Sequence, residues 1–271
     1  PIDSSQDPIV VAFTVILDNK KSNKTCSSLI GTMCNCIKSE VITGEALSTI
    51  VRKLETFQEL DNNTTLQIIQ FSTLIIGNHF LEMDILQSIL SLILSYCTSY
   101  DSVVSTSAIA ASDQIISSFL DFSQNKNDFL TTVNKRDIDL CFSMSCDKSI
   151  SFEKHIYKVT YLVLRDIVRM AIGQKTLWLH VGNFKINVAY GIIENIISHH
   201  LTIITDSDHF ERLISDAIKA SYQQKAPLTF CVTSMKFFME LMPDACASMF
   251  NNFLGDLNIN GSVNFNVEFN F

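Results

Sequence analysis

The residues best suited to metal chemistry lie close together between positions 199 and 209. They are His199, His200, Asp206, Asp208 and His209. A zinc site would need three or four of them to converge from a helix end, a loop and the start of the next helix. Each also has a simpler local role, because histidine is favourable at a helix C-terminus and aspartate caps an N-terminus. Their spacing matches no known class of metal site, so we expect no metal ligands here.

Cysteines are the second set of chemically capable residues. The eight are Cys26, Cys34, Cys36, Cys97, Cys141, Cys146, Cys231 and Cys246. They form neither the CxxC pairs of zinc ribbons nor the dense pattern of a secreted disulfide framework, so we expect reduced, mostly buried thiols in the cytosol. A nucleophilic cysteine would need a histidine and an acid brought to it by the fold, and the sequence singles out no such set.

Sequence motifs of the common enzyme classes are missing from the chain. It contains no GxSxG, HExxH, GxxxxGK[ST] or GxGxxG. We therefore predict no catalytic residues, no cofactor-binding residues and no cofactor, and we interpret the chain as not an enzyme. A metal-dependent enzyme built on the histidine cluster is the alternative that this interpretation leaves open.

The scarcity of proline and glycine indicates which elements position these residues. Glycine occurs 8 times, and the four prolines are Pro1, Pro8, Pro227 and Pro243. Because proline interrupts helices, the proline-free span from Ile9 to Ala226 indicates a mostly helical chain. A β-sandwich or barrel of this length would need more turn residues.

Amphipathic periodicity predicts a succession of helices with recognisable ends. The expected segments are a helix from a Thr43 cap to Phe57, one from a Thr64 cap to Gly77-Asn78, Leu81 to Cys97, Ser102 to Phe122, Asp137 to Ser145, Ile156 to Met170 closed by Gly173, a single helix over 176–200, a helix behind an Asp208/Glu211 capping box, Pro227 to Leu241, and Pro243 to Gly255. Residues 123–128 are the best linker candidate. The tail 259–271 is expected to be a short strand or a frayed end.

The spacing of these helices predicts a repeat architecture. Their centres lie roughly 20 residues apart, so helix pairs recur about every 40 residues, as in armadillo and HEAT arrays. Stacked repeats share one continuous core, which accounts for a hydrophobic fraction of 47%. We therefore predict an all-α fold, an armadillo/HEAT-like α-α superhelix, which is a right-handed solenoid of helix pairs.

The charge balance argues against nucleic acid as a partner. Lys+Arg 20 against Asp+Glu 28 gives a formal net charge of −8, whereas binding to phosphate backbones needs clustered basic residues. Lys20, Lys21 and Lys24 are too few for stable adsorption to lipid. The longest uncharged central stretch, 85–100, is too short to cross a bilayer of roughly 30 Å, so we expect no transmembrane helix. A start at Pro1 without a signal-peptide pattern favours part of a longer cytoplasmic protein.

The second half of the chain resembles a known family. The similarity is carried by DIDLCFSMSCDKS, TLWLHVGNFKINVAYGIIENIISHH, HFERLISDAIKASY and PLTFCVTSMKFFMELMPDACASMFNNFL, in that order. This order is similar to the N-terminal region of large Golgi Arf exchange factors, and the Mon-two-type relatives match best. The first half is similar to the dimerisation and cyclophilin-binding region that precedes it. The resemblance implies a dimerisation/cyclophilin-binding-like part at 1–128 and the start of a homology-upstream-like part at 129–271, continuous with the first.

Two features of that family are missing from the sequence. They are the Asn-Tyr-Asp-Cys box of the homology-upstream region and the exchange domain with its catalytic glutamate loop. The resemblance therefore implies a non-catalytic scaffold segment that self-associates and binds an Arf-like small GTPase or other trafficking proteins. It further implies a cytoplasmic location, peripheral on Golgi or endosomal membranes, with membrane contact only through partners. A generic HEAT/armadillo interaction adaptor outside trafficking is the alternative.

Five residues of the 176–200 segment are the predicted partner-binding residues. They are Trp178, Asn183, Phe184, Tyr190 and Glu194. Tyr190 and Glu194 belong to YGIIENI, which stands where the family has a Leu-x-Leu-Glu-Leu-Leu helix. Trp178 has two interpretations, a core residue or an exposed anchor of the kind common at binding hot spots. The segment is too apolar for a solvated face, so we expect a neighbouring helix or a partner to cover part of it.

Overall fold

The computed structural model describes residues 8–18, 23–39, 42, 44–55, 61–78, 83–124, 135–146, 150–152, 154–182, 184–205, 207–224 and 226–241. Within these ranges the chain forms twelve helices and no strand. The helices are α1 (Pro8–Asp18), α2 (Asn23–Lys38), α3 (Gly44–Glu55), α4 (Asn62–Asn78), α5 (Met83–Tyr96), α6 (Ser102–Gln124), α7 (Lys135–Ser145), α8 (His155–Ala171), α9 (Ile186–His199), α10 (Leu201–Thr205), α11 (Asp208–Gln224) and α12 (Leu228–Leu241).

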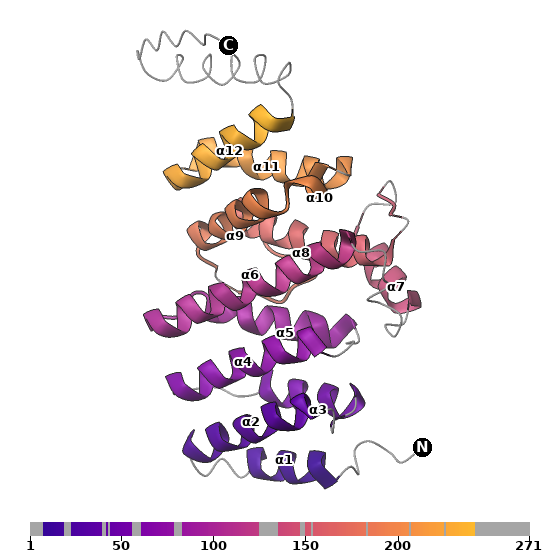
Figure 1. Cartoon of the computed structure of the whole chain (residues 1–271), viewed down its shortest axis with the longest axis vertical. Coiled ribbons are helices and arrows are strands. Elements are labelled where there is room, and N and C mark those ends of the chain that lie inside the picture. The colour runs from indigo at the N-terminus through magenta and orange to yellow at the C-terminus, as the bar shows by residue number, and fades with distance from the viewer. Residues whose placement is uncertain are drawn as a thin grey trace.

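The helices stack in two layers along one axis (Figure 1). In the first layer α1 packs on α3, α3 on α5, and α8 on α11; in the second α2 packs on α4, α4 on α6, α6 on α9, and α9 on α12. Contacts such as α5–α6 and α8–α9 join the layers, and α7 lies to one side against α5 and α8. The prediction of an all-α stack of helix pairs is confirmed.

The buried side chains form one continuous hydrophobic core along the stack. The predicted periodicity of α3 is confirmed, because Leu47, Ile50 and Leu54 are buried while Arg52 is exposed. Each such buried aliphatic side chain contributes about 1.5–3 kcal/mol relative to exposure. Since α6 packs on α8 and α9, the described helices before and after residue 128 share this core, although 125–134 lie outside the described residues.

Helix α8 ends at Ala171, and the predicted Gly173 closes it two residues later. This glycine has a φ of 73°, the left-handed region that residues with a Cβ disfavour. Its N–H donates to the carbonyl of Met170 at 3.1 Å, and the N–H of Gln174 donates to the carbonyl of Arg169 at 2.7 Å. These two bonds satisfy carbonyls that the helix leaves free and turn the chain sharply out of α8.

Two predicted helix caps are wrong by one to three residues. Thr64 lies inside α4, and the cap is Asp61, whose Oδ1 accepts a hydrogen bond from the N–H of Thr64 at 2.7 Å. Helix α11 begins at Asp208 itself, so the capping position belongs to Ser207. Aspartate is at least as good a cap as threonine. The start of α4 is therefore capped by a side chain of the expected kind, three residues earlier than predicted.

The prediction of one helix over 176–200 is wrong. Only Ile186–His199 is helical, and α10 follows as a separate short helix. The described residues between Ala171 and Ile186 are not helical. The apolar residues of this segment favoured a helix, but its backbone donors bond to a buried carboxylate instead of to carbonyls one turn earlier.

Helix α6 changes the expectation about membrane-spanning segments. Over Ser102–Asp121 it is long and apolar enough to cross a bilayer, and it is the one such helix in the described part of the chain. Asp113 interrupts the uncharged run of this helix, so it is not among the longest uncharged stretches of the sequence. In the stack α6 is covered by α4, α5, α8 and α9, as expected of the central helix of an array.

Several other predictions lie outside the described residues. These are the Thr43 cap, most of the 123–128 linker, the helix from Pro243 to Gly255 and the tail at 259–271. The first two linker residues, Ser123 and Gln124, are the last residues of α6. The remaining predicted helices are confirmed, with ends that differ by a few residues.

Candidate interaction site at the α8–α9 connection

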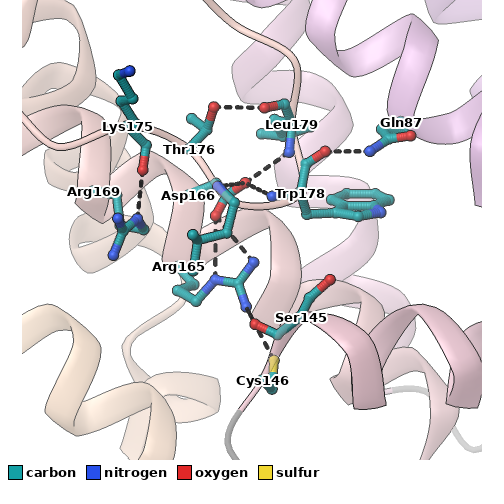
Figure 2. A network of polar contacts seen from close by, with 11 residues as sticks. Gln87, Ser145, Cys146, Arg165, Asp166, Arg169, Lys175, Thr176, Trp178 and Leu179 are labelled. Atoms are coloured by element: carbon teal, nitrogen blue, oxygen red, sulfur yellow. Dashed lines mark hydrogen bonds and ion pairs between the residues drawn. The ribbon is translucent and has the colours of Figure 1, made fainter.

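The connection between α8 and α9, residues 172–185, is fixed by one carboxylate. Asp166 of α8 is fully buried, and its Oδ2 accepts hydrogen bonds from the N–H groups of Leu177 at 3.1 Å, Trp178 at 2.6 Å and Leu179 at 2.7 Å (Figure 2). Three consecutive backbone donors on one charged acceptor give short, strong bonds. They hold the connection in a single non-helical shape.

The charge of Asp166 is balanced by its neighbour in the sequence. Arg165 donates from Nε at 3.2 Å and from Nη2 at 3.1 Å to the other carboxylate oxygen, Oδ1. Its Nη1 donates to the carbonyl of Ser145 and lies 3.1 Å from Sγ of Cys146. A buried ion pair is tolerated when its remaining donors and acceptors are also bonded. Arg165 therefore ties the end of α7 to the same network that holds the connection.

Helix α5 holds the connection from the opposite side. Gln87 donates to the carbonyl of Trp178, and Ser91 Oγ accepts a hydrogen bond from the N–H of His180 at 2.8 Å. Within the connection, Thr176 Oγ1 donates to the carbonyl of Leu179 at 2.5 Å. In the first layer the connection thus lies between α5 and α8, and it links the two halves of that layer (Figure 2).

With its backbone held by these hydrogen bonds, the connection has some side chains buried and others exposed. Trp178 and Leu179 are buried, with Trp178 only 4% exposed. Leu177 is 55% exposed and Ile186, the first residue of α9, is 37% exposed. His180 and Lys185 are exposed as well. We call Leu177, His180, Lys185 and Ile186 the connection surface. It is apolar at two positions and polar at two.

The structure places the predicted partner-binding residues mostly inside the molecule. For Trp178 the core interpretation is confirmed and the exposed-anchor interpretation is wrong. Tyr190 is fully buried, its ring lies 4.6 Å from that of Phe230, and burial raises the pKa of its hydroxyl. The half-buried Phe184 packs against the core. The half-buried Glu194 accepts a hydrogen bond from Thr233 Oγ1 at 3.3 Å, and Asn183 lies outside the described residues.

The histidine cluster is dispersed in the structure. His199 is exposed and His200 is buried, with its Nδ1 3.5 Å from Oδ1 of Asp121 on α6. The ring of His209 packs edge-on against that of Phe152, with 5.2 Å between the ring centroids. Asp208 is exposed at the start of α11, and Asp206 is outside the described residues. Within the described part of the chain, no group of three His, Cys, Asp or Glu residues is arranged to hold a metal ion.

Titratable groups gather where α6 meets α9, a feature that the sequence reasoning missed. Burial raises the pKa of Asp113 to about 6, against a hydrogen bond from Asn195 and the charge of His199 that lower it. Burial lowers the pKa of His200, against the charge of Asp121. The sequence contains one sign of this cluster. Asp113 lies four residues after Ile109 and three before Ile116, so it is a single acid on an otherwise apolar helix face.

The cysteines of the described residues are free thiols. Cys26, Cys34 and Cys97 are buried, whereas Cys36, Cys141, Cys146 and Cys231 are half-buried, so the prediction of mostly buried thiols holds for three of these seven. Burial raises the pKa of Cys97 to about 11 and raises the pKa values of Cys34, Cys141 and Cys231. Because the thiolate is the nucleophile, these shifts disfavour reactivity at neutral pH.

Comparison with known proteins gives no match to this chain among family models, curated proteins or solved structures.

Proposed function

We propose that this chain is a non-catalytic scaffold segment of a large Golgi or endosomal trafficking regulator. It would self-associate and bind an Arf-like small GTPase or other trafficking proteins. The observation that carries the scaffold proposal is the anchored α8–α9 connection on a two-layer helical stack. The trafficking context is supported by the resemblance of residues 137–254 to the N-terminal region of large Golgi Arf exchange factors.

The connection has the physical properties of a binding element. Loops held by a rigid scaffold are where proteins commonly carry binding residues. Here the backbone of residues 177–180 is fixed by bonds to Asp166 and Ser91, so little conformational freedom is left to lose on association. Such preorganisation improves affinity without additional contact area. Leu177 and Ile186 supply apolar contacts, and His180 and Lys185 supply a polar rim of the kind found at interfaces.

We propose that the 176–200 segment binds a partner, as predicted from the sequence, but through other side chains. Trp178 and Tyr190 are buried and act on a partner only by shaping the surface above them. Leu177 and Ile186, their exposed neighbours, are the residues that we propose touch it.

Affinity capture from a cell extract tests this proposal. The wild-type chain is compared with the double variant Leu177→Asp, Ile186→Asp. Aspartate is favourable in the first turn of a helix, so Ile186→Asp leaves α9 intact. We expect the wild type to retain Arf-like GTPases or Golgi and endosomal proteins, and the double variant to lose at least about 90% of them, a tenfold loss of affinity or more.

The matched control is Val103→Asp, which also places aspartate at an exposed position in the first turn of a helix. It should retain the same partners as wild type. Capture of proteins unrelated to trafficking would favour the generic adaptor instead. Equal capture by wild type and the double variant would contradict the assignment of the connection surface.

A further inference from the structure

The chain carries no acidic residue over the whole α8–α9 connection. Its longest stretch without aspartate or glutamate is 167–193, which contains Arg169, Lys175 and Lys185. The chain as a whole has a formal net charge of −8. The connection is therefore a local concentration of positive charge on an acidic molecule, and such a local field favours partners of the opposite charge.

Both lysines of the connection are exposed. The side chain of Lys175 extends away from the network around Asp166 (Figure 2), while its backbone carbonyl accepts a hydrogen bond from Arg169 Nε at 2.6 Å. Lys185 directly precedes α9, whose first turn contains no acidic residue. No carboxylate in that turn offsets the partial positive charge of the helix N-terminus. Two ammonium groups and this N-terminus thus attract the same kind of charge.

Acidic residues on the neighbouring helices are held by bonds of their own. Asp101 caps α6 by accepting hydrogen bonds from two backbone N–H groups at the start of that helix, at 3.0 and 2.9 Å. Residues 102–112 of α6, which packs on α9, carry no formal charge. Glu194 of α9 accepts a hydrogen bond from Thr233 of α12. The lysines of the connection therefore remain available to carboxylates of a partner.

Apolar side chains lie directly beside the two lysines in the sequence. Leu177, which is 55% exposed, follows Lys175 by two residues, and Ile186, which is 37% exposed, follows Lys185. A segment that complements both kinds of residue has an apolar stripe bordered by carboxylates. The described residues contain no strand, so they offer no sheet edge for strand pairing. An amphipathic helix is the mode of recognition that fits.

We propose that the connection surface, together with Lys175, recognises an acidic amphipathic helix of the partner. Leu177 and Ile186 contact its apolar stripe, and Lys175 and Lys185 pair with the carboxylates that border the stripe. The inference rests on the proposed function of the connection surface and adds the chemistry of the segment that binds there. Pairs at the rim of an interface act mainly on the association rate and on its dependence on salt.

Partners that carry phosphate groups fit this surface less well. Polybasic segments that bind anionic lipid contain about four to eight Lys or Arg residues, whereas the exposed lysines of the connection are Lys175 and Lys185. Affinity for nucleic acid likewise grows with the number of phosphates that are neutralised. A membrane would also meet the rest of a chain with a net charge of −8, which repels anionic surfaces. A single helix meets the connection alone.

Fluorescence anisotropy of the whole chain with two synthetic helical peptides tests the inference. Both peptides carry a stripe of leucines, bordered by glutamates in the first and by glutamines in the second. We expect wild type to bind the glutamate peptide at least about tenfold more tightly than the glutamine peptide. Lys175→Glu with Lys185→Glu should remove that preference. The matched control, Lys24→Glu with Lys236→Glu, makes the same change in net charge at exposed lysines of α2 and α12 and should keep it.

Circular dichroism reports whether each variant remains helical, and Lys175→Gln with Lys185→Gln replaces the charge reversal if that variant unfolds. The proposal is overturned if wild type binds both peptides equally or neither, or if the lysine variants keep the preference. It is also overturned if wild type binds phosphatidylserine vesicles through these lysines instead of the peptide.

An Arf-like GTPase loaded with a GTP analogue separates this inference from the proposed function. Binding of the glutamate peptide without binding of the GTPase supports the acidic helix and contradicts the GTPase as the partner. Binding of the GTPase that is unchanged by Lys175→Glu with Lys185→Glu overturns the acidic helix and leaves the proposed function standing.

Discussion

Asp166 is the residue on which the α8–α9 connection depends. It accepts three backbone hydrogen bonds and pairs with Arg165 in a buried environment. Asp166→Ala would leave those donors and the guanidinium without their acceptor, and breaking a buried pair in this way costs about 3–5 kcal/mol. We expect urea denaturation to show a loss of that size in the free energy of unfolding. Asp166→Asn, which keeps an acceptor oxygen of similar shape, should lose less.

A loss below about 1 kcal/mol for Asp166→Ala, the range of an exposed ion pair, would contradict this role. The matched control is Asp216→Ala, since Asp216 is an exposed aspartate on α11 whose contact with Lys219 is 3.8 Å. It should change stability by no more than a surface pair does.

Asp113 makes stability depend on pH at the α6–α9 contact. Its folded pKa of about 6 lies above the ordinary aspartate value of 3.8, because burial disfavours the ionised form. The folded state therefore binds the proton more tightly than the unfolded state between those values, and stability falls as pH rises through that window. Asp113→Asn removes the penalty, so it should stabilise the chain at pH 7.5 by about 1 kcal/mol after allowance for partial exposure, and by little at pH 4.

His200 acts in the opposite direction and must be separated from Asp113. Burial lowers the pKa of folded His200 below 6.5. The unfolded state therefore binds the proton more tightly, and the free energy of unfolding falls as the pH drops below that value. Denaturation curves at several pH values should show the Asp113→Asn gain with and without His200→Gln. A gain that is independent of pH would mean that the ionised Asp113 carboxylate carries no penalty.

At the scale of elements, α7 is attached to the stack by two kinds of contact besides the bond from Arg165 to the carbonyl of Ser145. Phe152 lies among the rings of Phe142, Tyr161 and Phe210, at centroid distances of 5.8, 5.4 and 5.4 Å. Lys158 of α8 donates to Asp139 of α7 at 2.6 Å and holds the pKa of that exposed carboxyl below its usual value. Since exposed pairs contribute little, the aromatic cluster contributes more to this attachment than the pair of Lys158 and Asp139.

Phe152→Ala should therefore loosen α7 selectively. Losing a half-buried aromatic side chain costs about 2–3 kcal/mol, less than the full value for a core phenylalanine. Hydrogen exchange in 135–145 should become faster while α4 keeps its protection. Uniform acceleration along the chain, or none in α7, would show that the cluster does not hold this helix. Asp139→Asn is the control and should change the exchange of α7 only slightly.

The helices could be predicted from the sequence because their signals are local. The spacing of Leu47, Ile50 and Leu54 or the glycine after α8 acts within one or two turns. The connection at 172–185 could not be predicted in this way, since its apolar residues fit a helix equally well. Its shape is decided by hydrogen bonds to Asp166, which lies 12 residues from Trp178, and to Gln87, which lies 91 residues from it; both are beyond the reach of a helical repeat. The same distant contacts bury Trp178, so the sequence located the candidate segment but not the side chains that face outward.

At the scale of the whole molecule, one core joins helices from both halves of the chain. The described helices α6, α8 and α9 pack on one another across residue 128, and the connection links α5 to α8. In stacked repeats stability is the sum of each repeat and its interfaces with the next. The network around Asp166 therefore strengthens an interface in the stack and keeps Leu177 exposed, where we propose that a partner binds.

We propose that the connection surface binds an Arf-like GTPase, and calorimetric titration is the direct test of that binding. Purified chain is titrated with an Arf-like GTPase loaded with a GTP analogue. We predict saturable binding by wild type and by Val103→Asp, and an affinity at least about tenfold weaker, or 1.4 kcal/mol, for Leu177→Asp with Ile186→Asp. No binding by wild type, or the same affinity for the double variant, would contradict the claim.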